Sequence, residues 1–129
     1  MSIQFNGDAA AVPRVLIVED DPGARRSLLL LLKGRGLNAV AYPTASQALA
    51  DAAAHPPACL VADYCLEDAD GISLLKRMRT MGWKGPAILI SGFGSNALSR
   101  EAETAGFALS FEKPLREHAL VDAIRRLVQ

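Results

Sequence analysis

The chain has 129 residues, half of them hydrophobic, and its formal net charge is zero. This size fits one domain with a substantial core, and the neutral charge argues against direct binding of nucleic acid through bulk positive charge. No apolar run approaches the ~20 residues that cross a bilayer, and the start of the chain lacks the features of a secretory signal. We therefore expect a cytoplasmic protein that does not enter a membrane.

The first 13 residues are small and polar and show no periodicity, which predicts a loose N-terminal tail at 1–13. Over 14–129, short apolar runs alternate with longer stretches of helical periodicity, as expected of a single domain. Strands are expected at 15–18, 39–42, 59–62, 87–90 and 108–111. Helices are expected at 22–33, 45–54, 71–81, 96–105 and 115–128.

Strands that are almost uninterrupted apolar runs are typical of a parallel sheet covered on both faces. The alternation therefore predicts an α/β fold, with a doubly wound five-stranded parallel sheet and five helices. The residues at the boundaries agree with it, because Pro22 suits a first helical turn, Thr44 or Ser46 and Asp70 can cap helices, and Gly106 can end one. Ligands of such folds bind beyond the carboxyl ends of the strands.

Polar side chains follow four of the five predicted strands. Glu19 and Asp20 come after the first strand, Asp63 after the third, Ser91 after the fourth and Lys113 after the fifth. Because the carboxyl ends of parallel strands share one edge of the sheet, we expect these side chains to surround one crevice. A single acid pair after a strand commonly belongs to a solvated loop or a helix cap. The occurrence of all these polar residues at one edge of the sheet is what favours a functional site.

Each of these groups has a use in phosphoryl chemistry. Clustered carboxylates form a hard oxygen site suited to Mg²⁺, and the cation removes their mutual repulsion. A carboxylate can also attack phosphorus and form an acyl phosphate. An ammonium group, a hydroxyl and the cation would then bind the phosphoryl oxygens.

The same residues give the chain a resemblance to a known family. Over 14–128 it resembles the receiver domain of two-component response regulators, on the stretch LIVEDD and on four further features: Asp63, Asp70–Gly71, Ser91–Gly92 and Lys113–Pro114. The resemblance implies a flavodoxin-like strand order, 2-1-3-4-5. It also implies transfer of a phosphoryl group from a phosphohistidine of a sensor histidine kinase or a histidine phosphotransfer protein.

The resemblance implies a Mg²⁺ site with four contributors. Asp20 and Asp63 would bind the ion directly, Glu19 would act largely through water, and Cys65 would give its backbone carbonyl. Asp63 would also be the phosphoacceptor.

Ser91 and Lys113 would bind the phosphoryl group, and their movement would switch a surface read by a downstream protein or a fused output domain. Such a domain catalyses its own phosphorylation and slow dephosphorylation and is not an ordinary enzyme.

The chain departs from the family at three positions. Glu67 stands where many relatives have proline, so we expect a more mobile loop there. The usual aromatic residue three before the lysine is replaced by Ser110, and Phe111 should point to the opposite side of the strand. The aromatic switch of relatives is therefore not expected. Phe93, two residues after Ser91, is expected to shield the acyl phosphate from water.

Two other classes of protein compete with this interpretation. A small Mg²⁺-dependent phosphohydrolase with an aspartate nucleophile is the alternative, but it needs a second acid where Cys65 stands. A flavodoxin-like nucleotide carrier needs a phosphate-binding loop after the first strand, where the sequence is EDDPG. That acidic loop would repel phosphate without a metal.

Five consecutive leucines, 28–32, cannot all face the sheet from one helix. The expected inner stripe leaves Leu29 and Leu30 outside, and it consists of Ala24, Leu28, Leu31, Leu32 and Arg35. The outer leucines are either incidentally exposed or a docking patch for a four-helix phosphodonor. In the last predicted helix, the stripe Leu120, Ala123, Ile124 and Leu127 should pack on the sheet, and its charged side could join a homodimer face.

Overall fold

The computed structural model describes residues 12–129, so most of the predicted N-terminal tail, 1–11, lies outside the described residues. Five strands alternate with five helices along the chain. The strands are β1 (Arg14–Val18), β2 (Asn38–Tyr42), β3 (Cys59–Asp63), β4 (Ala87–Ser91) and β5 (Leu109–Glu112). The helices are α1 (Pro22–Gly34), α2 (Ala45–Ala54), α3 (Gly71–Thr80), α4 (Asn96–Ala105) and α5 (Glu117–Leu127). Among these helices, none has both the length and the hydropathy to cross a membrane.

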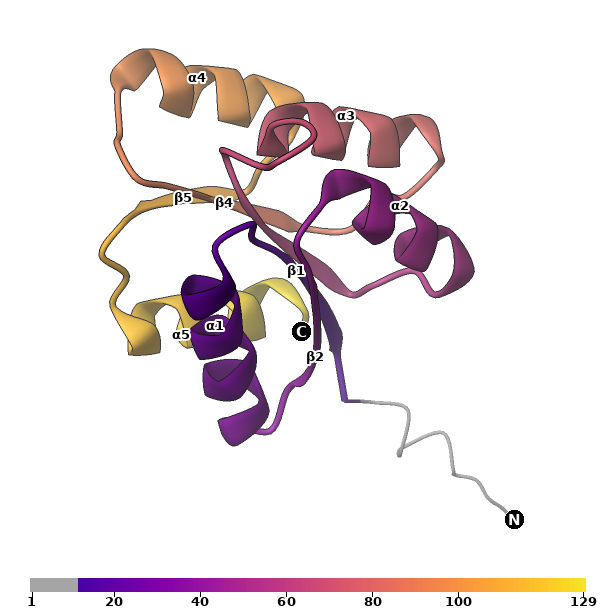
Figure 1. Ribbon diagram of the computed structural model, residues 1–129, viewed down its shortest axis with the longest axis vertical. Helices are drawn as coiled ribbons and strands as arrows, with labels where there is room; N and C mark the ends of the chain where they lie inside the picture. Colours follow the sequence, from indigo (N-terminus) through magenta and orange to yellow (C-terminus); the bar gives the residue numbers. More distant parts are fainter. Residues whose placement is uncertain (1–11) are drawn as a thin grey trace.

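The strands form one parallel sheet in the order β2-β1-β3-β4-β5, which confirms the predicted topology (Figure 1). Helices α2, α3 and α4 lie on one face of the sheet, and α1 and α5 lie on the other. Each strand is followed by a helix that returns to the opposite edge, so every strand has its carboxyl end at the same edge.

Two apolar cores hold the helices against the sheet. In β1, Leu16 and Val18 pack toward α2, α3 and α4, whereas Val15 and Ile17 pack toward α1 and α5. Strands β3 and β4 are buried along their whole length, as their apolar sequences predict. The core is therefore continuous up to the carboxyl edge of the sheet, and the polar residues at this edge directly follow buried strand residues.

The helix boundaries follow the capping residues. Asp21, Thr44, Asp70 and Ser95 each accept a hydrogen bond from the backbone N–H three residues later. Gly106 ends α4 in the left-handed region, with φ of 113°, as predicted. The predictions for Thr44, Asp70 and Gly106 are thus confirmed, whereas the caps at Asp21 and Ser95 were not foreseen.

The last helix begins two residues later than predicted, at Glu117 instead of Leu115. Leu115 packs against the core formed with α1 and α5, and Arg116 takes an extended backbone as the N-cap. The helix therefore begins only after the packed Leu115 and the extended Arg116.

The leucine run in α1 differs from the prediction at one of the two outer positions. Leu28 and Leu32 are buried, and Leu29 and Leu31 are partly buried against the same core. Leu30 is 58% exposed. The expectation that Leu29 is an outer residue was wrong, because its side chain packs against the core that α1 and α5 form with the sheet.

Candidate functional site

The predicted site residues come from the carboxyl ends of four strands. Glu19 follows β1, Asp63 ends β3, Ser91 ends β4, and Lys113 follows β5. Strands β1 and β3 are neighbours in the sheet, and the chain changes direction across the sheet at this pair. Doubly wound folds bind their ligands at such a point.

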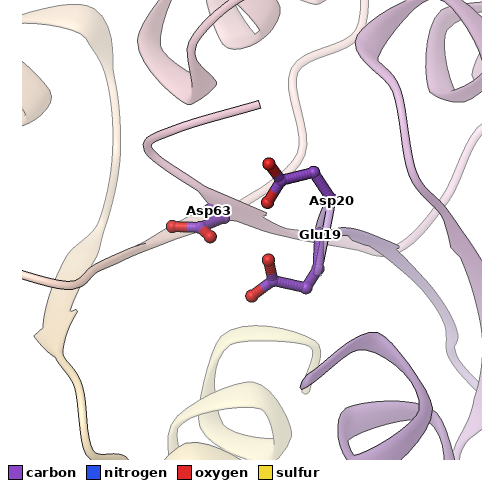
Figure 2. Close-up of side chains that lie close together, drawn as sticks. All are labelled: Glu19, Asp20 and Asp63. Carbon is purple, nitrogen blue, oxygen red and sulfur yellow. The ribbon is translucent and has the colours of Figure 1, made fainter. Parts of the chain in front are cut away.

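Three carboxylates gather beyond β1 and β3, as Figure 2 shows. One oxygen from each of Glu19, Asp20 and Asp63 lies within 4.8 Å of the other two. Glu19 and Asp63 are buried, and Asp20 is exposed. The donor set consists of hard oxygen atoms held close together, so these residues fit a hard divalent cation such as Mg²⁺.

Lys113 bridges the two buried acids. Its Nζ lies 2.9 Å from Oε1 of Glu19 and 3.0 Å from Oδ2 of Asp63. Burial by itself would lower the pKa of Lys113, but the hydrogen bonds to Glu19 and Asp63 outweigh it and raise the pKa. The ammonium group therefore stays charged and offsets part of the repulsion between the carboxylates.

The buried position of Glu19 changes the pKa of its carboxyl group. The pKa of Glu19 is raised to about 7, because burial and the hydrogen bond with Asp63 raise it by more than the bond from Lys113 lowers it. The amide of Asp21 also donates to Oε2 of Glu19 over 3.1 Å. Without a cation, Glu19 thus holds its proton up to near-neutral pH, because one ammonium group is shared by two buried carboxylates.

The three consecutive acids after β1 have three different roles. Glu19 turns into the buried site, and Asp20 stays at the solvent-exposed side of it. Asp21 caps α1, where its Oδ2 accepts from the amide of Ala24 over 2.8 Å. Arg25 donates from α1 to the carbonyl oxygens of Glu19 and Asp20, at 3.0 and 3.3 Å. The hydrogen bonds of Asp21 and Arg25 therefore fix the loop between β1 and α1.

A glycine lets α3 begin directly beside the backbone of the third strand. A Cβ atom on Gly71 would lie 2.5 Å from the carbonyl oxygen of Asp63 and 2.9 Å from Cδ1 of Leu89. Its amide also donates to the carbonyl of Tyr64 over 2.8 Å. The Asp70–Gly71 pair therefore combines a helix cap with a close approach that positions Asp63, a role that the sequence alone did not reveal.

Within residues 12–129, neither the Ser91 hydroxyl nor the Cys65 thiol makes a hydrogen bond to Asp63. The Ser91 hydroxyl donates to the carbonyl of Phe93 over 2.8 Å, and Cys65 is an exposed free thiol. The structure thus brings Glu19, Asp63 and Lys113 into direct contact and holds the Ser91 side chain on the loop after β4.

The strand β5 carries its aromatic residue on the side that the sequence predicts. Phe111 is partly buried in the core with α1 and α5, and Ser110 is exposed toward α4. A hollow of about 110 Å³ beside Ser110 is also lined by Ser91 and Leu98. No aromatic side chain at position 110 fills the space between α4 and the sheet.

The raised pKa of Glu19 predicts how stability depends on pH. The folded state binds more protons than the unfolded state between pH 4.5 and about 7, so Glu19 lowers the stability of the metal-free protein as pH rises through this window. Glutamine does not titrate. In chelator, the free energy of unfolding of Glu19→Gln should therefore rise relative to wild type between pH 5 and pH 8, as measured by urea denaturation.

The exposed Glu67 provides the control for this measurement. The difference between Glu67→Gln and wild type should be nearly constant over the same pH range. A constant difference for Glu19→Gln as well would contradict the burial of a proton-binding carboxylate at this position.

The sequence matches known proteins over nearly its whole length. Residues 15–125 match the family model of the response regulator receiver domain. The response regulator protein TodT of Pseudomonas putida is 31% identical over 123 residues, which cover 95% of this chain and 53% of TodT. The transcriptional regulatory protein FixJ of Azorhizobium caulinodans is 34% identical over 112 residues, which cover 86% of this chain and 53% of FixJ.

The fold is also shared with solved structures. A CheY-like response regulator receiver domain protein from Methanospirillum hungatei superposes with a TM-score of 0.85 at 25% identity, covering 91% of this chain and 94% of that one. The chain spans about half the length of TodT and FixJ. These matches favour the predicted receiver domain over the phosphohydrolase. The chain belongs to the receiver-domain family of two-component response regulators.

Proposed function

We propose that Asp63 is the phosphoacceptor of this receiver domain and takes a phosphoryl group from a phosphohistidine. The observation that carries the proposal is the contact of Asp63 with Lys113, 3.0 Å away, inside a trio of acids at the carboxyl edge. Lys113 is 32% exposed, so a phosphoryl group entering from solvent can reach it. A carboxylate beside a fixed cation is suited to attack phosphorus and to keep the added charge.

The reaction is a displacement at phosphorus. An oxygen of Asp63 forms a P–O bond while the P–N bond of the phosphohistidine breaks, and its electron pair goes to the imidazole nitrogen, which takes a proton from water. The products are an aspartyl phosphate and a neutral histidine on the donor. Lys113 then pairs with one phosphoryl oxygen. The Ser91 hydroxyl leaves the carbonyl of Phe93 and donates to a second phosphoryl oxygen.

The acidic residues support a role for Mg²⁺ in this site. Asp20 and Asp63 would hold the ion directly with the backbone carbonyl of Cys65, and Glu19 would act through water. Bound Mg²⁺ supplies positive charge to the carboxylates and to the incoming phosphoryl oxygens. The ion would thereby offset the repulsion between these acids and the phosphoryl group.

The phosphorylated domain would act as a switch and not as a multiple-turnover enzyme. Movement of Ser91 releases the carbonyl of Phe93, so the loop between β4 and α4 changes first. Phe93 is exposed on this loop and is the residue that we propose limits access of water to the acyl phosphate, which would slow autodephosphorylation. A downstream protein, a fused output domain or a second copy of the chain would bind the altered surface. We place the reaction in the cytoplasm, in keeping with the free, buried Cys59.

The first test of the proposed function is phosphorylation by a small donor. Wild-type protein incubated with phosphoramidate and Mg²⁺ should gain ~80 Da, detected by intact-mass spectrometry and removed by hydroxylamine. Asp63→Asn should gain nothing, because an amide oxygen is a poor nucleophile. Glu67→Gln removes a nearby exposed carboxylate and should label like wild type.

Two results would contradict the assignment of Asp63. One is equal labelling of wild type and Asp63→Asn, which would place the phosphoryl group on another side chain. The other is labelling of wild type that is unchanged when Mg²⁺ is replaced by a chelator.

The surface beside Lys113 supports a docking site for the helices of a phosphodonor. A hollow of about 230 Å³ lies between α1 and the segment that follows β5, and it is mostly apolar. Its lining includes Ser27, Leu31 and Pro114. The exposed Leu30 lies three residues after Ser27, on the same side of α1. A donor that packs apolar helices here would bring its phosphohistidine to the acidic site.

Charge at Leu30 should therefore separate two kinds of donor. Leu30→Glu should slow phosphotransfer from a histidine phosphotransfer protein about tenfold, since a buried unpaired charge would weaken docking by more than 1 kcal/mol. Labelling by phosphoramidate should not change, because a small donor needs no docking surface. Transfer rates measured with ³²P-labelled donor provide the readout.

The control adds the same charge to a helix on the other face of the sheet. Ala53 is exposed on α2, and Ala53→Glu should leave both reactions unchanged. Loss of labelling by both donors in Leu30→Glu would indicate a damaged fold and would argue against a docking role for this surface.

A further inference from the structure

The loop that follows the proposed phosphoacceptor is held by a carboxylate that the proposed reaction does not use. Asp68 lies between β3 and α3, and its Oδ1 accepts from the amide of Ala45 over 2.8 Å. Its Oδ2 accepts from the amide of Ser46 over 3.0 Å. These two residues begin α2, which already has a local cap at Thr44. The first turn of α2 is therefore bound by one side chain from its own segment and one from the loop after β3.

The two hydrogen bonds that Asp68 accepts from α2 are charge-assisted. A carboxylate that accepts two N–H groups at a helix N-terminus makes charge-assisted hydrogen bonds and faces the positive end of the helix dipole. The hydrogen bonds from Ala45 and Ser46 lower the pKa of Asp68, so the group is ionised at neutral pH. The neighbouring Glu67, by contrast, makes no side-chain hydrogen bond or ion pair within residues 12–129.

The loop is anchored at its base and at its tip. At the base, the amide of Tyr64 donates to the carbonyl of Ile90 over 2.7 Å, which continues the contact between β3 and β4. Cys65 pairs with Asp70 across the loop in an isolated bridge. At the tip, Asp68 supplies the bonds to α2. The backbone at Cys65 therefore lies in a turn fixed on both sides.

We propose that Asp68 is a positioning residue for the metal site. It holds the loop against α2, and this fixes the backbone at Cys65, whose carbonyl is the proposed ligand of the ion. The inference rests on the proposed role of Mg²⁺. Because coupling between two sites is reciprocal, Mg²⁺ binding in turn strengthens the bonds from Ala45 and Ser46 to Asp68.

The test compares neighbouring acids of the same loop. Asp68→Ala and Glu67→Ala each remove one negative charge, but Asp68→Ala also removes the two bonds to α2. The dissociation constant for Mg²⁺, measured by calorimetry well below the unfolding temperature, should rise on the order of tenfold in Asp68→Ala. It should change less than about twofold in Glu67→Ala, because that side chain is solvent-screened. Asp68→Asn keeps an acceptor oxygen and should fall between wild type and Asp68→Ala.

A second readout follows the coupling directly, and its first measurement uses only the wild-type protein. Amide hydrogen exchange of Ala45 and Ser46, measured by NMR on wild-type protein, should slow when Mg²⁺ is added. In Asp68→Ala the same amides should exchange at a rate that Mg²⁺ does not change. A merely structural cap of α2 would slow exchange equally with and without the ion.

The outcomes separate this inference from the proposed function. If wild type binds Mg²⁺ and Asp68→Ala binds it equally well, or if both alanine variants lose the same affinity, the positioning role is overturned and the proposed function stands. The positioning role is also overturned if the amide exchange rates of Ala45 and Ser46 in wild type do not change when Mg²⁺ binds. If wild type binds no Mg²⁺, the proposed metal site and this inference fail together.

Discussion

The shared ammonium group of Lys113 is the interaction on which the site depends. Glu19 and Asp63 are both buried at the edge of the sheet, and each is within 3.0 Å of the same Nζ atom. Removing two carboxylates from water is costly unless a positive charge accompanies them. One lysine compensates the pair in part, which is why the pKa of Glu19 stays raised to about 7. A divalent cation would complete the compensation, and this need is the physical basis of the proposed Mg²⁺ chemistry.

The fold supplies further compensation through its helices. In a parallel sheet with helical crossovers, each helix that follows a strand begins at the carboxyl edge, where its partial positive charge favours acids. Three carboxylates accept hydrogen bonds from backbone N–H groups in the first turns of helices: Asp21 in α1, Asp68 in α2 and Asp70 in α3. The acids at this edge thus fall into two sets with different roles. One set stabilises helix ends, and the other forms the candidate site.

Much of this arrangement could be predicted from the sequence because it follows from periodicity. Apolar runs and cap residues located the strands and most helix ends, and parallel topology then placed Glu19, Asp63 and Lys113 together. Contacts between side chains and distant backbone could not be predicted in this way. Asp68 is 23 residues from its partner Ala45, and no local pattern marks such a pair. The half-buried Leu29 and the hydrogen bond of Ser91 to Phe93 likewise depend on how packed elements meet.

The most direct test of the account is the stability of Lys113→Met with and without Mg²⁺, measured by urea denaturation beside Lys76→Met as an exposed control. In chelator, Lys113→Met should be less stable than wild type by about 1–3 kcal/mol, because two buried carboxylates lose their partner. Saturating Mg²⁺ should stabilise Lys113→Met more than wild type, since the ion replaces the missing charge. If Lys113→Met matches wild type in chelator and Mg²⁺ stabilises both equally, charge compensation by Lys113 does not hold this site together.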